Sequence, residues 1–147
     1  MLPAQKSAAP PLAGILSGEL ARNFAILSKK SDPPVYYIAY SVTDEETGAL
    51  NAVLGGITSD TRAHRRLGEC SVRVGTPALD NFHVVDGDRP AYTASGALPV
   101  QDDPMAIRLA FWRMTGSAQR AATQRFQQVE TALKNKQDPE HPSADFS

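Results

Sequence analysis

The stretch VYYIAYSVT, residues 35–43, decides the fold, because its apolar side chains alternate with the two-residue period of a β-strand. A second stretch, RLGECSVRV at residues 66–74, alternates in the same way and puts Cys70, Val72 and Val74 on one face. Each stretch has one face that is suited to a core. Together they predict two strands of one sheet.

The residues between these two strands predict a third, weaker strand. Asp44–Gly48 is acidic and ends in glycine, which predicts a turn, and Leu50–Ser59 follows as the weaker strand. Gly55 and Gly56 lie inside that strand and suggest a bulge or a close approach of another backbone. Ser59–His64 is read as a polar connection. Because all these links are short, we expect antiparallel pairing.

One helix is predicted before the strands in the sequence and one after them. Apolar residues recur at helical spacing from Leu12 to Leu27, and Asp32-Pro33-Pro34 ends that helix. The segment Gly75–Asp103 is expected to be irregular apart from a short strand at Phe82–Val85. Asp103-Pro104 is a good helix start, and a long helix is predicted from there to about Lys136. Leu109, Trp112, Phe126, Val129 and Leu133 are its expected apolar contacts, and Trp112, Tyr36 and Tyr40 are expected in the core.

The predicted fold class is therefore α+β. It is a small antiparallel sheet of three or more strands, packed against an N-terminal helix and a long C-terminal helix. The predicted domain is 12–137, between a flexible leader at 1–11 and a tail at 138–147.

Composition describes an ordinary globular chain. It has 147 residues, 41% of them hydrophobic and 21% charged, with a net charge of -1 and one cysteine. The total charge does not favour nucleic acid or an anionic membrane, and one cysteine excludes an intrachain disulfide. A cytoplasmic location and no membrane are expected.

The residues that could carry chemistry are scattered. His64, His83 and His141 lie far apart in the sequence and do not have the spacing of zinc ligands. Cys70 lies on the apolar face of its strand, and a thiol buried there behaves as a small hydrophobe. The carboxylate pairs Glu45-Glu46 and Asp102-Asp103 are explained by turn formation and helix capping. We expect no catalytic residue, no metal and no cofactor in this chain.

Basic residues gather in two places. The long helix carries Arg108, Arg113, Arg120, Arg125, Lys134 and Lys136, and a second group is Arg62, Arg65 and Arg66. Such side chains could contact the phosphates of a polyanion. The arginines of the helix are spread around it, however, which favours an ordinary solvated surface.

Three segments, taken in order, resemble one family. The first is Val35–Tyr40, and the second is Val72–Gly75 followed by Leu79-Asp80-Asn81. The third begins at Leu98-Pro99 and Asp102-Asp103-Pro104. It continues with Arg108, Ala110, Trp112, Thr115, Ala118, Leu133 and Asn135-Lys136, and it ends at Asp145-Phe146-Ser147. Together they resemble the N-terminal region of TldD/PmbA-type proteins, putative zinc metallopeptidases once labelled modulators of DNA gyrase. TldD-type members carry a His-Glu-x-x-x-His zinc helix downstream of this region. This chain has no such motif, so no catalytic residue is carried over to it.

The resemblance implies a non-catalytic cap or scaffold domain that pairs with a TldD/PmbA-type subunit, as a homo- or hetero-oligomer, or helps to form a peptide cavity. Zinc is expected only in the family's downstream region. Gly55, Gly56, Asp80 and Asn81 are the expected contact residues for a peptide or protein, with strand addition as the binding mode. The alternatives are a free-standing module that binds a polyanion or a protein through the arginine-rich helix, and a decayed fragment without function.

Overall fold

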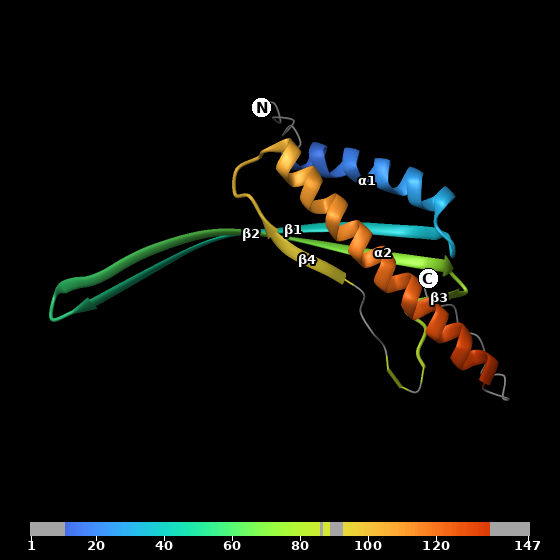
Figure 1. The fold of residues 1–147 in the computed structure, drawn as a ribbon. Helices are drawn as coiled ribbons and strands as arrows, with labels where there is room; N and C mark the ends of the chain where they lie inside the picture. Colours follow the sequence, from blue (N-terminus) through green and yellow to red (C-terminus); the bar gives the residue numbers. More distant parts are fainter. Residues whose placement is uncertain (1–10, 86, 89–92, 136–147) are drawn as a thin grey trace, which may run out of the picture.

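The computed structural model describes residues 11–85, 87–88 and 93–135. The elements follow the order α1 (Pro11–Lys30), β1 (Val35–Val53), β2 (Gly56–Thr76), β3 (Leu79–Asp80), β4 (Thr93–Leu98) and α2 (Pro104–Asn135) (Figure 1). Both predicted helices are present within a residue or two of their predicted bounds. Residues 1–10 of the predicted leader and the whole predicted tail lie outside the described residues.

Among the described residues, the sheet is antiparallel and has four strands. β1 pairs with β2 from Val35 to Val53, and β4 pairs with the middle of β2, from Arg66 opposite Leu98 to Ser71 opposite Thr93. β3 adds a short pairing at the end of β2. Both helices pack on one face of this sheet (Figure 1). The predicted α+β class is confirmed.

The core lies between that face and the helices. Its fully buried side chains include Val35 from β1, Val72 and Val74 from β2, and Ile107 and Phe111 from α2. Burying one such side chain contributes about 1.5–3 kcal/mol. The predicted burial of Cys70 is confirmed. Desolvation raises the pKa of its thiol to about 11, so it stays uncharged at neutral pH.

The predicted turn at Asp44–Gly48 and the predicted connection at Ser59–His64 are wrong. Both segments are strand, and β1 and β2 form one hairpin whose turn is at Leu54-Gly55. Both turn residues have positive φ, 51° and 80°, as a tight two-residue hairpin turn requires. The two glycines therefore mark the turn and not a bulge within a strand. The one register shift near the turn lies between Asn51 and Ala52.

The segment Gly75–Asp103 is less irregular than predicted. It contains β3 and β4, and the predicted strand at Phe82–Val85 is reduced to a single bridge between Val85 and Asp88. The sequence of β4, TASGAL, has weak strand propensity. Its pairing with β2 and the burial of Leu98 in the core stabilise it instead.

The prediction that Leu109 and Trp112 are core contacts of the long helix is also wrong. Leu109 is 43% exposed and Trp112 is 55% exposed. The buried stripe of α2 contains Ile107, Phe111, Ala118, Ala122 and Val129, and a helical period based on those residues turns Leu109 and Trp112 outward. Phe126 and Val129 are buried as predicted.

Gly75 is expected to be essential for stability. Its φ is +102°, and a Cβ there would lie 2.6 Å from the Leu79 carbonyl oxygen and 2.7 Å from the Phe126 ring. Gly75→Ala should therefore lower the free energy of unfolding by about 2–4 kcal/mol in chemical denaturation. Gly48→Ala is the matched control, because a Cβ at Gly48 meets no atom within 4 Å. An equal effect of the two substitutions would contradict the strain at Gly75.

Candidate functional site

The outer half of the β1–β2 hairpin extends beyond the body of the protein (Figure 1). We call residues 44–65 the arm. All of them are exposed except Glu45 and Ser59, which are half-buried. Ten residues of β1 from Asp44 to Val53 reach about 33 Å at the rise of a β-strand. A segment of this length that buries almost nothing within its own chain is the most unusual feature of the fold.

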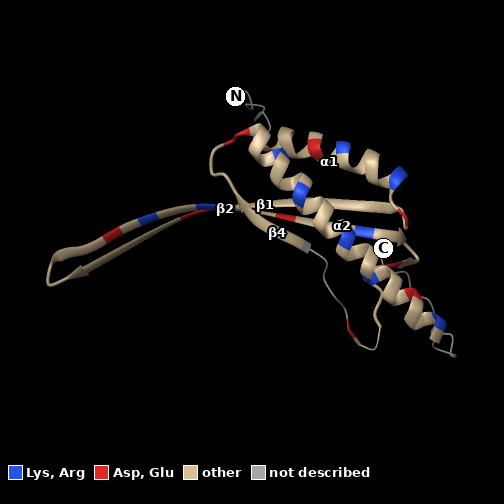
Figure 2. Ribbon diagram, viewed as in Figure 1, with Lys and Arg blue, Asp and Glu red and all other residues tan. Residues whose placement is uncertain are grey.

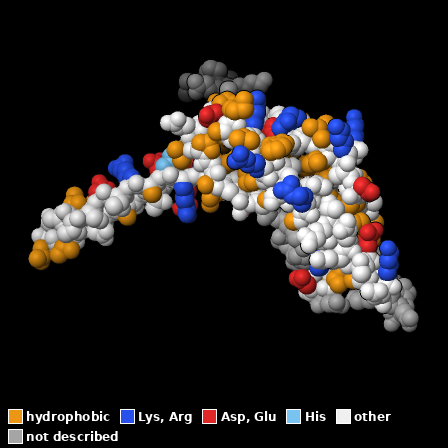
Figure 3. Space-filling model, in the orientation of Figure 1, with side chains coloured by type: hydrophobic (Ala, Val, Ile, Leu, Met, Phe, Trp, Pro, Cys, Tyr) orange, Lys and Arg blue, Asp and Glu red, His pale blue; other side chains and the backbone are white. Residues whose placement is uncertain are grey.

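The end of the arm is apolar. Its exposed fractions are 63% for Leu50, 61% for Val53, 103% for Leu54 and 69% for Ile57. These four residues are the apolar tip, and hydrophobic side chains gather there in the space-filling view (Figure 3). Asp60 lies directly opposite Leu50 across the two strands, so a carboxylate borders the tip. Single exposed apolar residues are common on proteins, but a cluster at the end of an extension is a candidate interaction site.

Buried Arg66 fixes the root of the arm. It donates from Nε and Nη2 to Asp44 Oδ2, at 2.9 and 2.7 Å, which ties β2 to β1. It also donates from Nη1 to Asp102 Oδ1 at 2.7 Å and to the Pro99 carbonyl oxygen at 3.2 Å, in the connection between β4 and α2. One guanidinium thus joins three segments where the arm leaves the body. The ribbon of Figure 2 is coloured for both basic and acidic residues in this region.

Further charged and polar contacts stiffen the arm. His64 contacts the other oxygen of Asp44, and Arg65 donates to Glu45 at 2.6 Å. Hydrogen bonds from Arg66 first, and then from His64, hold the pKa of Asp44 below its ordinary value. Nearer the tip, the Asn51 side-chain amide donates to the Ser59 hydroxyl at 2.9 Å. The arm is therefore a cross-linked ladder and not a loose loop.

The four residues expected to contact a partner do not lie together. Gly55 and Gly56 are at the turn of the arm, whereas Asp80 and Asn81 are buried near the far end of β2, roughly 60 Å away along the strand. The Asn81 side chain accepts from the Val74 amide and donates to the Val72 carbonyl.

Asp80 also has partners inside the fold. It accepts from the Tyr36 hydroxyl and the Arg73 guanidinium, both at 2.6 Å, and from the Phe82 amide at 2.7 Å. Burial and this contact with Asp80 raise the pKa of Tyr36. Asp80 and Asn81 thus stabilise the body through hydrogen bonds, whereas Gly55 and Gly56 lie at the turn of the arm.

A groove between α1 and α2 is the second candidate surface, called the helix groove below. Its volume is about 380 Å³, and its lining residues are Asn23, Ile26, Leu27, Trp112, Arg113, Thr115, Gly116 and Arg120. Asn23 and Thr115 are buried and both hydrogen-bond to the Tyr40 hydroxyl, at 2.8 and 2.6 Å. This polar chain fixes α1, β1 and α2 against each other beneath the groove.

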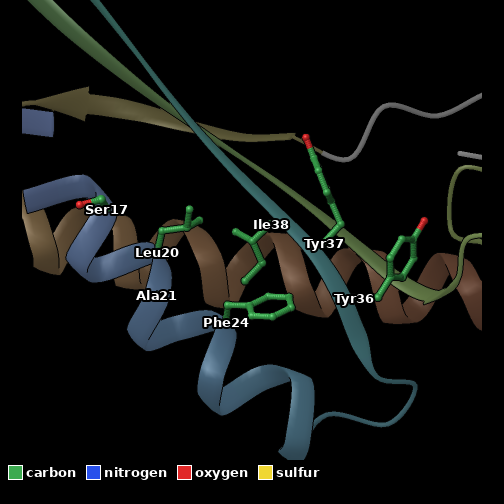
Figure 4. Close-up of a pocket in the computed structure, with 7 residues that line it drawn as sticks. All are labelled: Ser17, Leu20, Ala21, Phe24, Tyr36, Tyr37 and Ile38. Carbon is green, nitrogen blue, oxygen red and sulfur yellow. The ribbon is translucent and has the colours of Figure 1, made fainter. Parts of the chain in front are cut away.

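A smaller apolar pocket of about 260 Å³ lies on the other flank of α1, against β1 (Figure 4). Leu20, Phe24 and Ile38 lie close together between the helix and the strand, and the Tyr37 hydroxyl points away from them. None of the described residues that line this pocket is charged. It offers little to orient a ligand.

Several of the basic residues that could contact a polyanion have partners within the chain. Arg65 and Arg66 pair with carboxylates, and buried Arg125 lies 3.4 Å from the Asp88 carbonyl oxygen. Within residues 11–85, 87–88 and 93–135, no group of three or more His, Cys, Asp or Glu side chains could hold a metal ion. His141 lies outside the described residues. Neither described helix is both long enough and apolar enough to span a membrane.

No protein-family model, curated protein or solved structure matches this chain.

Removing the Arg66 guanidinium should loosen the arm without unfolding the body. Arg66→Met keeps the apolar stem and loses the hydrogen bonds to Asp44, Asp102 and Pro99. Amide hydrogen exchange in residues 44–65 should become about tenfold faster or more, while exchange in the core of β2 changes little. Arg62→Met is the matched control within the arm. Equal exchange of the arm in the two variants would show that Arg66 does not fix it.

The same contact predicts a response to acid. The pKa of Asp44 is lowered in the folded chain, so its contribution is complete above its unfolded value near pH 4 and is lost as the pH falls through the folded value. Arm protection, corrected for intrinsic exchange, should therefore be level from pH 7 to about pH 4 and fall below it. Asp44→Asn should be less protected at pH 7 and should lack this acid step. An acid step of the same size in Asp44→Asn would assign it to other groups.

Proposed function

We propose that this chain is a non-catalytic pairing domain, and that its arm inserts the apolar tip into a partner protein. The observation that carries the proposal is the tip itself, four large apolar side chains that are 61–103% exposed at the end of a braced hairpin. Water contact with such a cluster is unfavourable, and burial in a partner removes it at about 25 cal/mol per Å².

The stiffness of the arm favours this role. Binding by a flexible loop loses free energy when the loop becomes ordered, and a pre-ordered hairpin avoids much of that loss. The hydrogen bonds of Arg66 and the ladder from Glu45 to Asn51 order the arm in the free chain. A rigid apolar tip of this kind has the character of an interface hot spot.

The class of partner is proposed from the family resemblance. Where the structure describes them, the segments that resemble TldD/PmbA-type proteins lie in the inner part of β1, the end of β2, β3, the end of β4 and α2, which all belong to the body. Lys136 and residues 145–147 lie outside the described residues. A body of this kind suggests a cap or scaffold domain in a peptidase assembly, paired with a TldD/PmbA-type subunit. The arm contains none of the segments that resemble this family, and we propose that it determines which partner the chain binds.

A protein partner is favoured over a lipid or nucleic acid surface by the charges near the tip. Asp60 lies opposite Leu50 at the border of the tip, and the same face then carries Arg62 opposite Gly48 and Glu46 opposite His64 nearer the root. Anionic phosphates would repel these carboxylates. An apolar pocket with a basic rim would accept them.

A charge at the tip should abolish pairing. Leu54→Asp should weaken binding to purified TldD-type or PmbA-type subunits by about 30-fold or more, the effect of losing roughly 2 kcal/mol at a hot spot. Ala63→Asp, which adds the same charge in the middle of the arm, should change the affinity less than about threefold. Isothermal titration calorimetry with each purified subunit measures both variants.

Two results would contradict this function. One is an unchanged affinity of Leu54→Asp, which would put the interface elsewhere. The other is binding of the unmodified chain to vesicles of anionic phospholipid, lost in Leu54→Asp, which would make the tip a membrane contact.

A further inference from the structure

The helix groove is a described surface whose chemistry complements the tip. The outward stripe of α2 carries Met105, Leu109 and Trp112, which are 74%, 43% and 55% exposed, and α1 adds Ile26 at 41%. The first three follow a four- and three-residue spacing, so they form one continuous row along the helix. This row and the groove beside it form a second exposed apolar surface on a chain that already has one.

The charges around the groove are opposite to those around the tip. Arg113 and Arg120 line the groove, and no carboxylate does. Basic side chains lie among hydrophobic ones over α1 and α2 in the space-filling view (Figure 3). Asp60 borders the tip, opposite Leu50, and it has no ion pair among the described residues. An apolar centre with opposite charges at its border is the arrangement expected of two matching surfaces.

The arm cannot reach the groove of its own chain. Its root is held at Arg66, and the strands leave the body in a direction that carries the tip away from both helices (Figure 1). Folding back would require breaking the continuous ladder between β1 and β2. A tip that meets a helix groove must therefore belong to another molecule.

We infer that the apolar tip of one copy docks in the helix groove of a second copy of this chain. The inference rests on the proposed function, since it uses the same tip, and it names the partner and the surface that receives the tip. Leu54 and Ile57 meet Trp112 and Ile26, and Asp60 approaches Arg113 and Arg120. When both copies exchange arms, the two contacts close a symmetric dimer and leave neither tip in water.

Complementation between two defective variants tests the inference. Leu54→Asp removes the tip and keeps the groove, and Trp112→Asp removes the groove and keeps the tip. In sedimentation velocity the unmodified chain should form dimers, and each variant alone should be monomeric. An equimolar mixture of the two variants should recover a dimer, weaker than the unmodified one because only one of its two contacts remains. Ala63→Asp and Gln124→Asp, exposed positions outside both surfaces, are the matched controls and should dimerise.

A photo-crosslinker gives an independent map of the contact. p-Benzoylphenylalanine at position 54 should cross-link to peptides that contain Ile26 or Trp112 of a second copy. The product should disappear when Trp112→Asp chains are the acceptor.

The remaining outcomes overturn the inference in distinguishable ways. In one such outcome, Trp112→Asp still forms dimers, Leu54→Asp does not, and the cross-links join one tip to another. The tip of one copy would then bind the tip of the second copy and not its helix groove. A monomeric unmodified chain that still binds a TldD/PmbA-type subunit through Leu54 would overturn self-docking and leave the proposed function intact. A monomeric chain whose Leu54→Asp variant binds those subunits equally well would overturn both.

Discussion

The pairing of β1 with β2 is the constraint on which the rest of the structure depends. A single register runs from Tyr37 opposite Arg73 to Asn51 opposite Ser59, so the same alternation governs the body and the arm. In the body it turns Cys70 and Val72 toward the helices. In the arm it places Asp44 against Arg66 and Glu45 against Arg65. A slip of one residue would expose the core face and separate these charges, so the core fixes the geometry of the arm.

The core face and the arm meet at Gly68 and Arg66. A Cβ at Gly68 would lie 3.0 Å from Leu98 and Met114 and 3.1 Å from Phe111, so α2 and β4 press closely on β2 there. Two residues earlier, Arg66 ends the apolar layer and bridges to Asp44 and Asp102. The boundary between core and arm is thus one short step along β2, from a residue without a side chain to one whose three guanidinium nitrogens all donate hydrogen bonds. This abrupt change explains how the hairpin can leave the body without unravelling.

The helices and the inner strands could be predicted from the sequence, because their periodicity and proline punctuation are local. The arm could not, because DEETG at residues 44–48 has the composition of a turn, and only its pairing partners make it a strand. A signal was nevertheless present. Acidic residues 44–46 and basic residues 64–66 lie symmetrically about Leu54-Gly55, which is the pattern of cross-strand ion pairs in a hairpin.

The exposure of individual side chains is harder to predict from the sequence. Trp112 is apolar, and only the packing of α2 shows that Phe111 takes the buried place beside it. Gly55 and Gly56 belong to the hairpin turn and not to the predicted bulge within a strand, whereas Asp80 and Asn81 carry an ordinary structural role that a motif cannot reveal.

An isolated hairpin with free edges is a hazard, because unpaired strand edges and apolar side chains promote aggregation. The arm limits that hazard through its charges. Glu46, Asp60 and Arg62 interrupt its exposed surface, and the register shift between Asn51 and Ala52 disturbs the regular edge just before the tip. These features disfavour edge-to-edge pairing along the arm and leave the tip as its one continuous apolar surface. An arm protected along its edges and uncovered at its end is suited to a receptor that takes the end alone. A groove with apolar walls and arginines at its border meets that requirement, whereas an open sheet edge does not.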